Sequence, residues 1–148
     1  MTYTLQGILA KPTSAILTMF VDSVVELEHD VALIPFTDRF RERHGIPSLS
    51  LGPKSRELPR SIAKIVQMAS KDDRAAYVEA EFWAGIGGQA GSVWERAVAV
   101  GDVIVSGEAI NEALRFLHVQ HAAGADEFDT VGLGRYRHTE DWLQSASP

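Results

Sequence analysis

Cysteine is absent from the sequence. Its absence excludes disulfide bonds and thiolate chemistry, and it fits a protein of the reducing cytoplasm. The N-terminal residues lack a basic segment followed by a long apolar core, so we expect no signal peptide. The uninterrupted apolar runs are far too short to span a bilayer, so we expect no association with a membrane. The GxSxG motif is also missing, so no standard nucleophile motif points to acyl transfer.

The composition that remains is that of an ordinary globular protein, with 45% apolar and 23% charged residues. A length of 148 residues suits a single domain, residues 1–148, and no repeat or low-complexity linker divides it. The formal net charge of −6 argues against nucleic-acid binding. No cofactor is expected, and the sequence sets no oligomeric state.

Charge is unevenly distributed along the chain. Residues 39–64 contain seven Lys and Arg residues against two Glu residues, whereas the rest contains seven basic residues against eighteen acidic ones. Such asymmetry is typical of a docking face for an acidic partner. It also arises when a basic segment packs over the protein's own acidic surface, and this second interpretation is the one we favour.

Hydrophobic periodicity predicts an α+β fold with a mostly antiparallel sheet, two to three packed helices and a central Gly-Gly hairpin. The strands are predicted over residues 3–10, 24–28, 31–36, 76–83, 90–98 and 103–105. Helices are predicted after Thr13, over residues 39–44 and 58–69, after Ser106 and after Thr139. The clearest helix has an apolar face formed by Leu58, Ile62, Ile65 and Val66.

The most informative stretch is AYVEAEFWAGIGGQAGSVWER, residues 76–96. A two-residue hairpin turn needs positive φ at both central positions, which predicts the turn at Gly87-Gly88. This register sets Glu79 opposite Arg96 and Glu81 opposite Trp94. With a period of two, the first strand has one face formed by Ala76, Val78, Ala80 and Phe82, and another formed by Tyr77, Glu79, Glu81 and Trp83.

The glycines and carboxylates of this stretch each have two interpretations. A phosphate-binding loop would have to open a helix, whereas the residues after Gly88 are strand-like, so we reject that function. Glu79 and Glu81 lie between aromatic residues, an arrangement that separates acid and base roles in catalysis. A solvated strand face with one Glu–Arg pair also explains them, and we favour this structural interpretation.

The second dense polar stretch covers residues 118–142. Side chains such as His118, His121 and Asp126 offer nitrogen and oxygen ligands of the kind that bind zinc. No established ligand spacing is present, and histidines near a helix C-terminus are favourable without a metal. We therefore expect no metal site.

Cationic residues follow in the same stretch. Arg135 and Arg137 offer an anion two guanidinium groups beside the backbone amides of a glycine-rich turn. They also lie close in sequence to the acidic residues 126–129. Pairing with those carboxylates, which would fasten the segment to the domain, is the interpretation we favour.

A resemblance covers roughly residues 75–142. The stretches AYVEAEFWAGIGGQ, INEALRFL and DEFDTVGLGRYRHTEDW resemble short uncharacterised bacterial proteins with a similar C-terminal half. The resemblance implies a bacterial, cytoplasmic origin. It implies no activity and assigns no catalytic residue.

Two functions are compatible with these features. We expect a non-enzymatic domain that binds a protein partner, of an accessory or toxin-neutralising kind, because the chain is small and acidic and carries no catalytic motif. The alternative is a small-ligand-binding or acid/base enzyme domain built on Glu79, Glu81, Arg96, Arg135 and His138. Its candidate catalytic residues are Glu79, Glu81 and His138, and its candidate ligand-binding residues are Tyr77, Trp83, Trp94, Arg96, Arg135 and Arg137.

Overall fold

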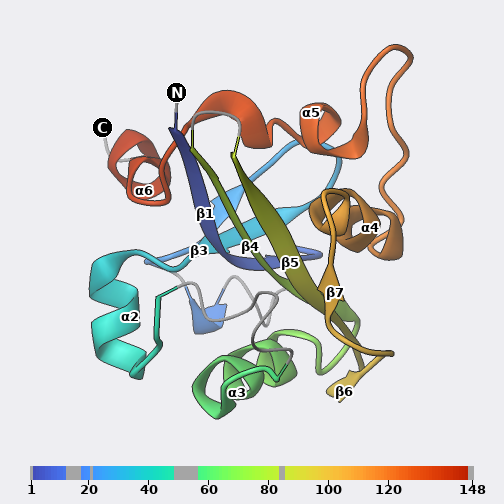
Figure 1. The fold of residues 1–148 in the computed structure, drawn as a ribbon. Helices are drawn as coiled ribbons and strands as arrows, with labels where there is room; N and C mark the ends of the chain where they lie inside the picture. The colour runs from blue at the N-terminus through green and yellow to red at the C-terminus, as the bar shows by residue number, and fades with distance from the viewer. Residues whose placement is uncertain (1, 13–17, 21, 49–56, 84–85, 147–148) are drawn as a thin grey trace.

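A computed structural model describes residues 2–12, 18–20, 22–48, 57–83 and 86–146. Within these ranges, seven antiparallel strands form one sheet in the order β2-β3-β1-β4-β5-β6, and β7 also pairs with β5 (Figure 1). The strands are β1 (Thr2–Ala10), β2 (Val25–Glu26), β3 (Ala32–Pro35), β4 (Arg74–Trp83), β5 (Ile86–Glu95), β6 (Val98–Ala99) and β7 (Ile104–Val105). The helices are α2 (Asp38–His44), α3 (Arg60–Ala69), α4 (Ala109–Phe116), α5 (Glu127–Val131), the 3₁₀-helix η1 (Leu133–Arg135) and α6 (Asp141–Ala146). The predicted α+β fold with a mostly antiparallel sheet is confirmed.

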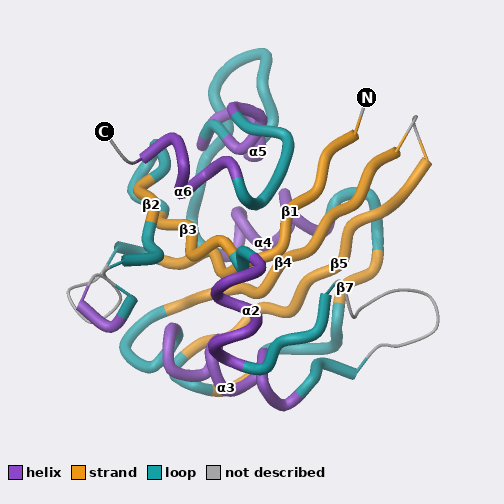
Figure 2. Tube along the Cα trace, turned by 90° about the vertical axis from the view of Figure 1, so that its left-hand side faces the viewer, coloured by secondary structure: helices purple, strands orange, loops and turns teal. Residues whose placement is uncertain are grey.

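Helices cover both faces of the sheet (Figures 1 and 2). On one face, apolar side chains of β1, β4 and β5 pack with those of α4, α5, η1 and α6. On the other, side chains of the same strands pack with those of α2 and α3. Because successive strand residues point to opposite faces, Val78 belongs to the first core and its neighbour Tyr77 to the second. The central strands are therefore buried on both sides.

The helix predicted over residues 58–69 is α3. Ile62, Ile65 and Val66 are buried in it, as their spacing predicts. Pro59 occupies the position before the first helical turn, and Leu58 packs against the core from outside the helix. The helix predicted after Thr13 falls mostly on residues 13–17, which lie outside the described residues.

Two turns have left-handed backbone angles. Gly45 ends α2 in the left-handed conformation, with φ of 65°. His29 and Asp30, with φ of 60° and 62°, lie between β2 and β3. Both turns follow from local sequence, because glycine, aspartate and histidine tolerate positive φ better than most residues do.

The predicted hairpin forms, but its register is wrong. Gly87 pairs with Phe82 and Gly88 with Glu81 inside the ladder, so the two glycines belong to β5 and open no helix. The innermost described pair is Trp83 with Ile86, and residues 84–85 between them lie outside the described residues. Glu79 consequently pairs with Ala90 rather than with Arg96.

The far end of the hairpin explains this register. Arg96 and Ala97 both have positive φ, of 49° and 68°, and the chain turns back there so that β6 pairs with β5. Strand β5 therefore ends at Glu95, which lies opposite Arg74 in the ladder and forms an ion pair of 2.7 Å with it. The partner of Glu79 moves by an even number of residues, so the predicted division of the hairpin into two faces still holds.

Candidate functional site

A chain of buried hydrogen bonds crosses the sheet face that packs against α2 and α3. The Tyr77 hydroxyl donates to Oε1 of Glu79 over 2.7 Å and accepts from Nε2 of Gln6 over 3.1 Å. Nε2 of Gln6 also donates to the carbonyl oxygen of Pro47 over 2.9 Å. Gln6 and Glu79 are at most 5% exposed, and Tyr77 is fully buried.

The burial of Glu79 corrects the expected solvated strand face. Sequence periodicity places Glu79 and Tyr77 on one face but does not show that α2 and α3 cover it. The expected Glu79–Arg96 pair does not form, because Arg96 lies at the β5–β6 turn, where its backbone N–H donates to Asp73. Glu81, two residues along the same face, is exposed. The two carboxylates therefore occupy different environments.

The direction of these buried hydrogen bonds follows from the types of their donors and acceptors. The side-chain oxygen of Gln6 makes no hydrogen bond with a described residue. A backbone carbonyl only accepts hydrogen bonds, so the nitrogen of the Gln6 amide must face Pro47. Its two N–H groups are then used, and no described residue donates to the carbonyl oxygen Oε1. A buried acceptor without a donor costs about 1–3 kcal/mol, so this atom calls for a partner.

The residues around His138 lie along the edge of β1. Strand β3 pairs with β1 from Gly7 to Ala10, which leaves the preceding part of that edge to the C-terminal segment. The Thr4 N–H donates to the Arg137 carbonyl over 2.7 Å, and the Gln6 N–H donates to the Thr139 hydroxyl over 3.2 Å. This segment therefore brings His138 and Glu140 beside Gln6.

A hollow of about 300 Å³ opens beside Gln6, and we call it the Gln6 hollow. Its lining includes Gln6, Asp38, Arg41, His138 and Glu140. The Glu140 side chain accepts from the Asp38 N–H over 2.6 Å at the start of α2. The hollow thus combines one guanidinium group, two carboxylates and the acceptor of Gln6.

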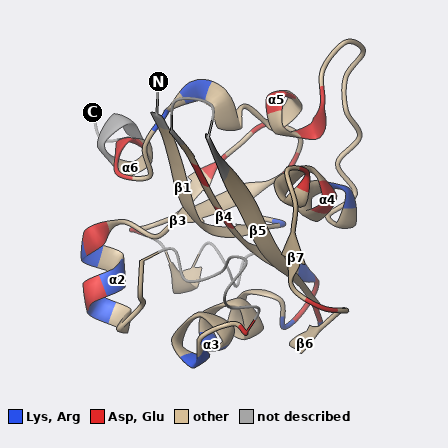
Figure 3. Cartoon of the chain, in the orientation of Figure 1, with Lys and Arg blue, Asp and Glu red and all other residues tan. Residues whose placement is uncertain are grey.

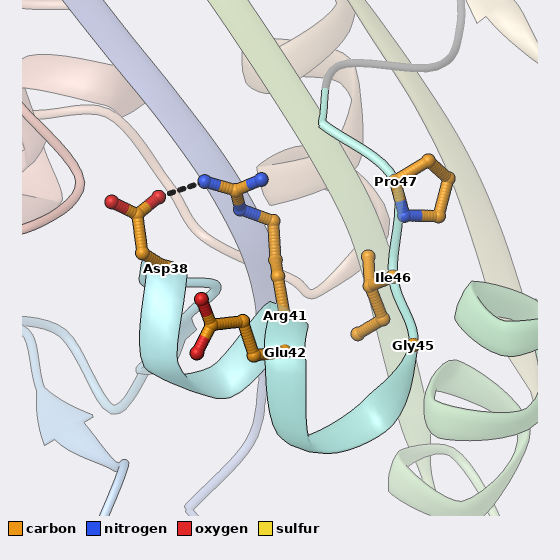
Figure 4. Close-up of a pocket in the computed structure, with 6 residues that line it drawn as sticks. All are labelled: Asp38, Arg41, Glu42, Gly45, Ile46 and Pro47. Carbon is orange, nitrogen blue, oxygen red and sulfur yellow. Dashed lines mark hydrogen bonds and ion pairs between the residues drawn. The ribbon is translucent and has the colours of Figure 1, made fainter.

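A second hollow, of about 480 Å³, shares Asp38 and Arg41 with the first (Figure 4). Arg41 reaches back along α2 to form an ion pair with the exposed carboxylate of Asp38. Ile46 and Pro47, which follow the turn at Gly45, form the opposite side. Arg41 therefore stands at the junction of the two hollows.

A third hollow, of about 370 Å³, lies on the opposite face of the sheet, and we call it the aromatic hollow. Its apolar walls are the rings of Tyr3, Phe82 and Phe128. The Tyr3 ring centroid lies 6.3 Å from that of Phe82 and 5.5 Å from that of Phe128. Glu108 and Asp126 add two carboxylates at its rim. No local sequence pattern predicts this hollow, because its members come from β1, β4, α4 and α5.

Asn111 holds the polar side of the aromatic hollow together. Its Nδ2 donates to Glu108 over 2.7 Å and to Asp126 over 3.1 Å, while its Oδ1 accepts from the Phe128 N–H over 2.8 Å. The residue is buried and all its hydrogen-bonding groups are used. An asparagine on the buried side of an apolar helix, in INEALRFL, was the sequence signal for this site, because buried amides need designated partners.

The carboxylates at the start of α5 titrate differently. The backbone N–H of Asp129, which donates to Asp126, lowers the pKa of the Asp126 carboxyl group. The negative charge of Asp126 in turn raises the pKa of the Asp129 carboxyl group. A hydrogen bond of 2.9 Å from Arg115 lowers the pKa of Glu127. At neutral pH Asp126 is thus a fixed negative charge beside the aromatic rings.

The five residues of the alternative enzyme site are not brought together. Glu79 is buried beside Gln6, Arg96 lies at the β5–β6 turn and Arg135 lies in η1. The expected pairing of Arg135 and Arg137 with residues 126–129 is also wrong. Among the described residues neither arginine forms an ion pair, and Glu127 pairs with Arg115 of α4.

Other predicted ligand-binding side chains are separated too. Trp94 is half-buried and donates to the Ser92 hydroxyl over 2.8 Å. The side chain of Trp83 lies outside the described residues. Arg137 is exposed and contributes its carbonyl group to the edge of β1. Of the predicted set, Tyr77 and Glu79 are joined by a hydrogen bond. His138 lines the Gln6 hollow, and Gln6 in turn donates to the Tyr77 hydroxyl.

The two helical layers differ in their balance of charge, although α2 and α4 each carry both signs (Figure 3). Arg39, Arg43, Arg60 and Lys64 are exposed on α2 and α3. Within the described part of residues 39–64, the ion pair present is the one between Arg41 and Asp38 inside α2. The sequence favours packing of the basic segment over an acidic surface of the protein. The described part of residues 39–64 is not held to such a surface by ion pairs. Acidic residues gather instead around α4 and α5, at positions 108, 112, 126, 127 and 129.

The described ranges have neither a metal-ligand cluster nor a membrane-spanning helix. They contain no group of three or more His, Asp or Glu side chains placed to hold a metal ion, and His118 and His121 are both exposed. None of the helices described is both long and apolar enough to cross a membrane. Comparison with protein-family models, curated proteins and solved structures found no match.

Proposed function

We propose that this protein is a protein-binding domain whose aromatic hollow receives a basic side chain of the partner. The observation that carries the proposal is the combination of three aromatic rings and two carboxylates around one hollow. No ion pair among the described residues involves Glu108 or Asp126, and Arg115, which interacts electrostatically with Glu108, is paired with Glu127 instead. A Lys or Arg side chain carries a positive charge, which interacts favourably both with the aromatic rings and with the carboxylates.

The physical chemistry of such a site is well defined. A cation over an aromatic face is stabilised by about 0.5–1 kcal/mol when exposed and by about 2 kcal/mol when desolvated. The two carboxylates add Coulombic attraction, and Asn111 holds both of them before a partner arrives. Pre-arranged charged groups of this kind speed association and select partners. The surrounding acidic residues of α4 and α5 extend the same field over a wider face.

The dispersal of the candidate catalytic residues supports binding over acid/base catalysis. General acid and base groups must reach the same substrate, whereas Glu79 is buried, Glu81 is exposed and His138 lies in the C-terminal segment at the edge of β1. In the finer form of the proposal, the protein is an accessory or toxin-neutralising factor that covers a basic surface of its partner. This form is supported by the charge complementarity between the acidic face around α4 and α5 and a basic partner surface.

The test uses short blocked peptides with one central Arg, Lys or norleucine, titrated into isotopically labelled protein and followed by NMR. We expect the Arg and Lys peptides to shift the amide signals of residues 108–111 and 126–128, and the norleucine peptide to leave them unchanged. Higher salt should weaken the effect. Equal binding of the norleucine peptide, or shifts confined to another face, would contradict the proposal.

Two variants and a matched control sharpen this test. Phe128→Leu removes one ring but keeps apolar volume, and Glu108→Gln removes one carboxylate at a residue that is exposed. Each should weaken binding of the Arg peptide about fivefold, which corresponds to about 1 kcal/mol. Glu112→Gln removes an exposed charge from the same helix outside the hollow, and it should change affinity much less. A loss as large in Glu112→Gln would show that general acidity, not the hollow, is responsible.

A further inference from the structure

We propose that the Gln6 hollow is a binding site for a small zwitterion of the α-amino acid type. Its ammonium group donates to Oε1 of Gln6, and its carboxylate binds the guanidinium group of Arg41. This inference concerns the opposite face of the sheet from the aromatic hollow and stands independently of the proposed function.

The donor half of the ligand follows from Gln6. Gln6 is 3% exposed and lines the hollow. Its side-chain oxygen Oε1 has no hydrogen-bond donor among the described residues. Pro47 and Tyr77 hold the amide in one orientation, so the carbonyl oxygen cannot exchange places with the nitrogen. A ligand that satisfies Gln6 must therefore donate an N–H or O–H.

The charges of the hollow select an ammonium group as that donor. Asp38 and Glu140 are both carboxylates of the lining, and Glu140 is already fixed there by its hydrogen bond from the Asp38 N–H. A cationic donor is attracted by both, whereas a neutral hydroxyl group is not. The ammonium group carries three N–H donors, one for Gln6 and two for neighbouring acceptors.

The acid half of the ligand follows from Arg41. Its Nη2 is engaged with Asp38, and its other nitrogens have no acceptor among the described residues. The partner carboxylate of Asp38 is 72% exposed, so this ion pair is weak and leaves the guanidinium group open to a second carboxylate. The second N–H of Nη2 and the parallel N–H of its neighbouring nitrogen remain for a bidentate carboxylate. The volume of about 300 Å³ is at the small end of the range for ligand pockets.

Free amino acids test the proposal, with glycine, L-alanine, L-serine, L-glutamine and L-glutamate as probes. Each is titrated into ¹⁵N-labelled protein to about 10 mM, and the side-chain NH₂ signal of Gln6 and the Nε–H signal of Arg41 are followed. At least one should shift both signals saturably. Its N-acetyl form, which lacks the ammonium group, and its amide form, which lacks the carboxylate, should each bind about tenfold more weakly.

Variants on α2 supply the matched comparison. Arg41→Gln should weaken binding of the free amino acid about tenfold and should leave the weak binding of the amide form unchanged. Arg39→Gln removes an exposed charge from the same helix outside the hollow and should bind like the wild type. Gln6→Met should lose binding altogether. If Gln6→Met does not fold, the proposal is still tested by the comparison of Arg41→Gln with Arg39→Gln and by the N-acetyl and amide forms of the ligand.

Three results would overturn the proposal. If no probe shifts the Gln6 signal at the highest concentration, the hollow is filled by water alone. If the N-acetyl or amide form binds as well as the free amino acid, the ligand is not recognised as a zwitterion. If Arg39→Gln weakens binding as much as Arg41→Gln, the charge of the helix is responsible rather than the site.

Discussion

The hydroxyl group of Tyr77 offers the sharpest test of the buried hydrogen-bond chain. It donates to Glu79 and accepts from Gln6, and its residue is fully buried. Tyr77→Phe removes this one atom and keeps the ring, which packs in a tilted arrangement against Phe36 with a centroid distance of 5.9 Å. Any loss of stability therefore reports on the hydrogen bonds rather than on apolar packing.

The expected magnitude follows from the two bonds. A hydrogen bond to a carboxylate contributes about 1.5–3 kcal/mol, and an N–H of Gln6 left without its acceptor costs about 1–3 kcal/mol. These two effects overlap, so we expect Tyr77→Phe to lower the free energy of unfolding by about 2–4 kcal/mol. With an m-value of about 2 kcal/mol/M, the urea midpoint should fall by about 1–2 M.

Two further tyrosines provide controls with the same chemical change. The Tyr3 hydroxyl makes one neutral hydrogen bond, of 3.0 Å, to the Leu133 carbonyl, so Tyr3→Phe should cost about 1 kcal/mol. The Tyr136 hydroxyl makes no hydrogen bond with the described residues, so Tyr136→Phe should change stability by less than about 0.5 kcal/mol.

Urea unfolding of the three variants, followed by circular dichroism and tryptophan fluorescence, measures the series. Coincident transitions are needed to compare free energies. If Tyr77→Phe proved as mild as Tyr136→Phe, the Tyr77 hydroxyl would be solvated, as on an open hairpin face. The burial of Glu79 by α2 and α3 would then be refuted.

Two further predictions concern the register and the acid response. Gly88→Val should change stability by less than about 0.5 kcal/mol, because Gly88 is an exposed strand residue and a Cβ there meets nothing within 4 Å. Gly7→Ala should instead destabilise by more than about 2 kcal/mol, because its Cβ would lie 2.4 Å from the Ile34 carbonyl oxygen; thermal denaturation of both variants checks the pair. The lowered pKa of Glu127 contributes stability that is present above the unfolded-state pKa of about 4.3 and is lost as the pH falls through the folded-state value. Glu127→Gln should therefore reduce the slope of unfolding free energy against pH below about pH 4.3, and an unchanged slope in urea titrations would contradict the assignment.

The sequence by itself determined the elements whose causes are local. The apolar spacing of Ile62, Ile65 and Val66 specifies α3, and Gly45 specifies where α2 ends. Alternation along residues 76–83 specifies which side chains share a face of β4. These features depend on residues within a few positions of one another, so composition and periodicity are enough to reveal them.

The tertiary structure decided the register and the burial. Gly87-Gly88 is a good turn in isolation, but the backbone reversal at Arg96-Ala97 ends β5 and moves the pairing. The alternating face of Tyr77 and Glu79 has the pattern of a solvated face. Only the packing of α2 and α3 over that face converts it into a buried polar layer.

The candidate sites required the fold for the same reason. Gln6, Arg41 and His138 lie far apart in the sequence, and they line one hollow because the C-terminal segment takes the edge of β1 that β3 leaves open. Hydrogen bonds between distant backbone groups have no periodicity in the sequence. A site assembled from them is therefore visible only once the chain is folded.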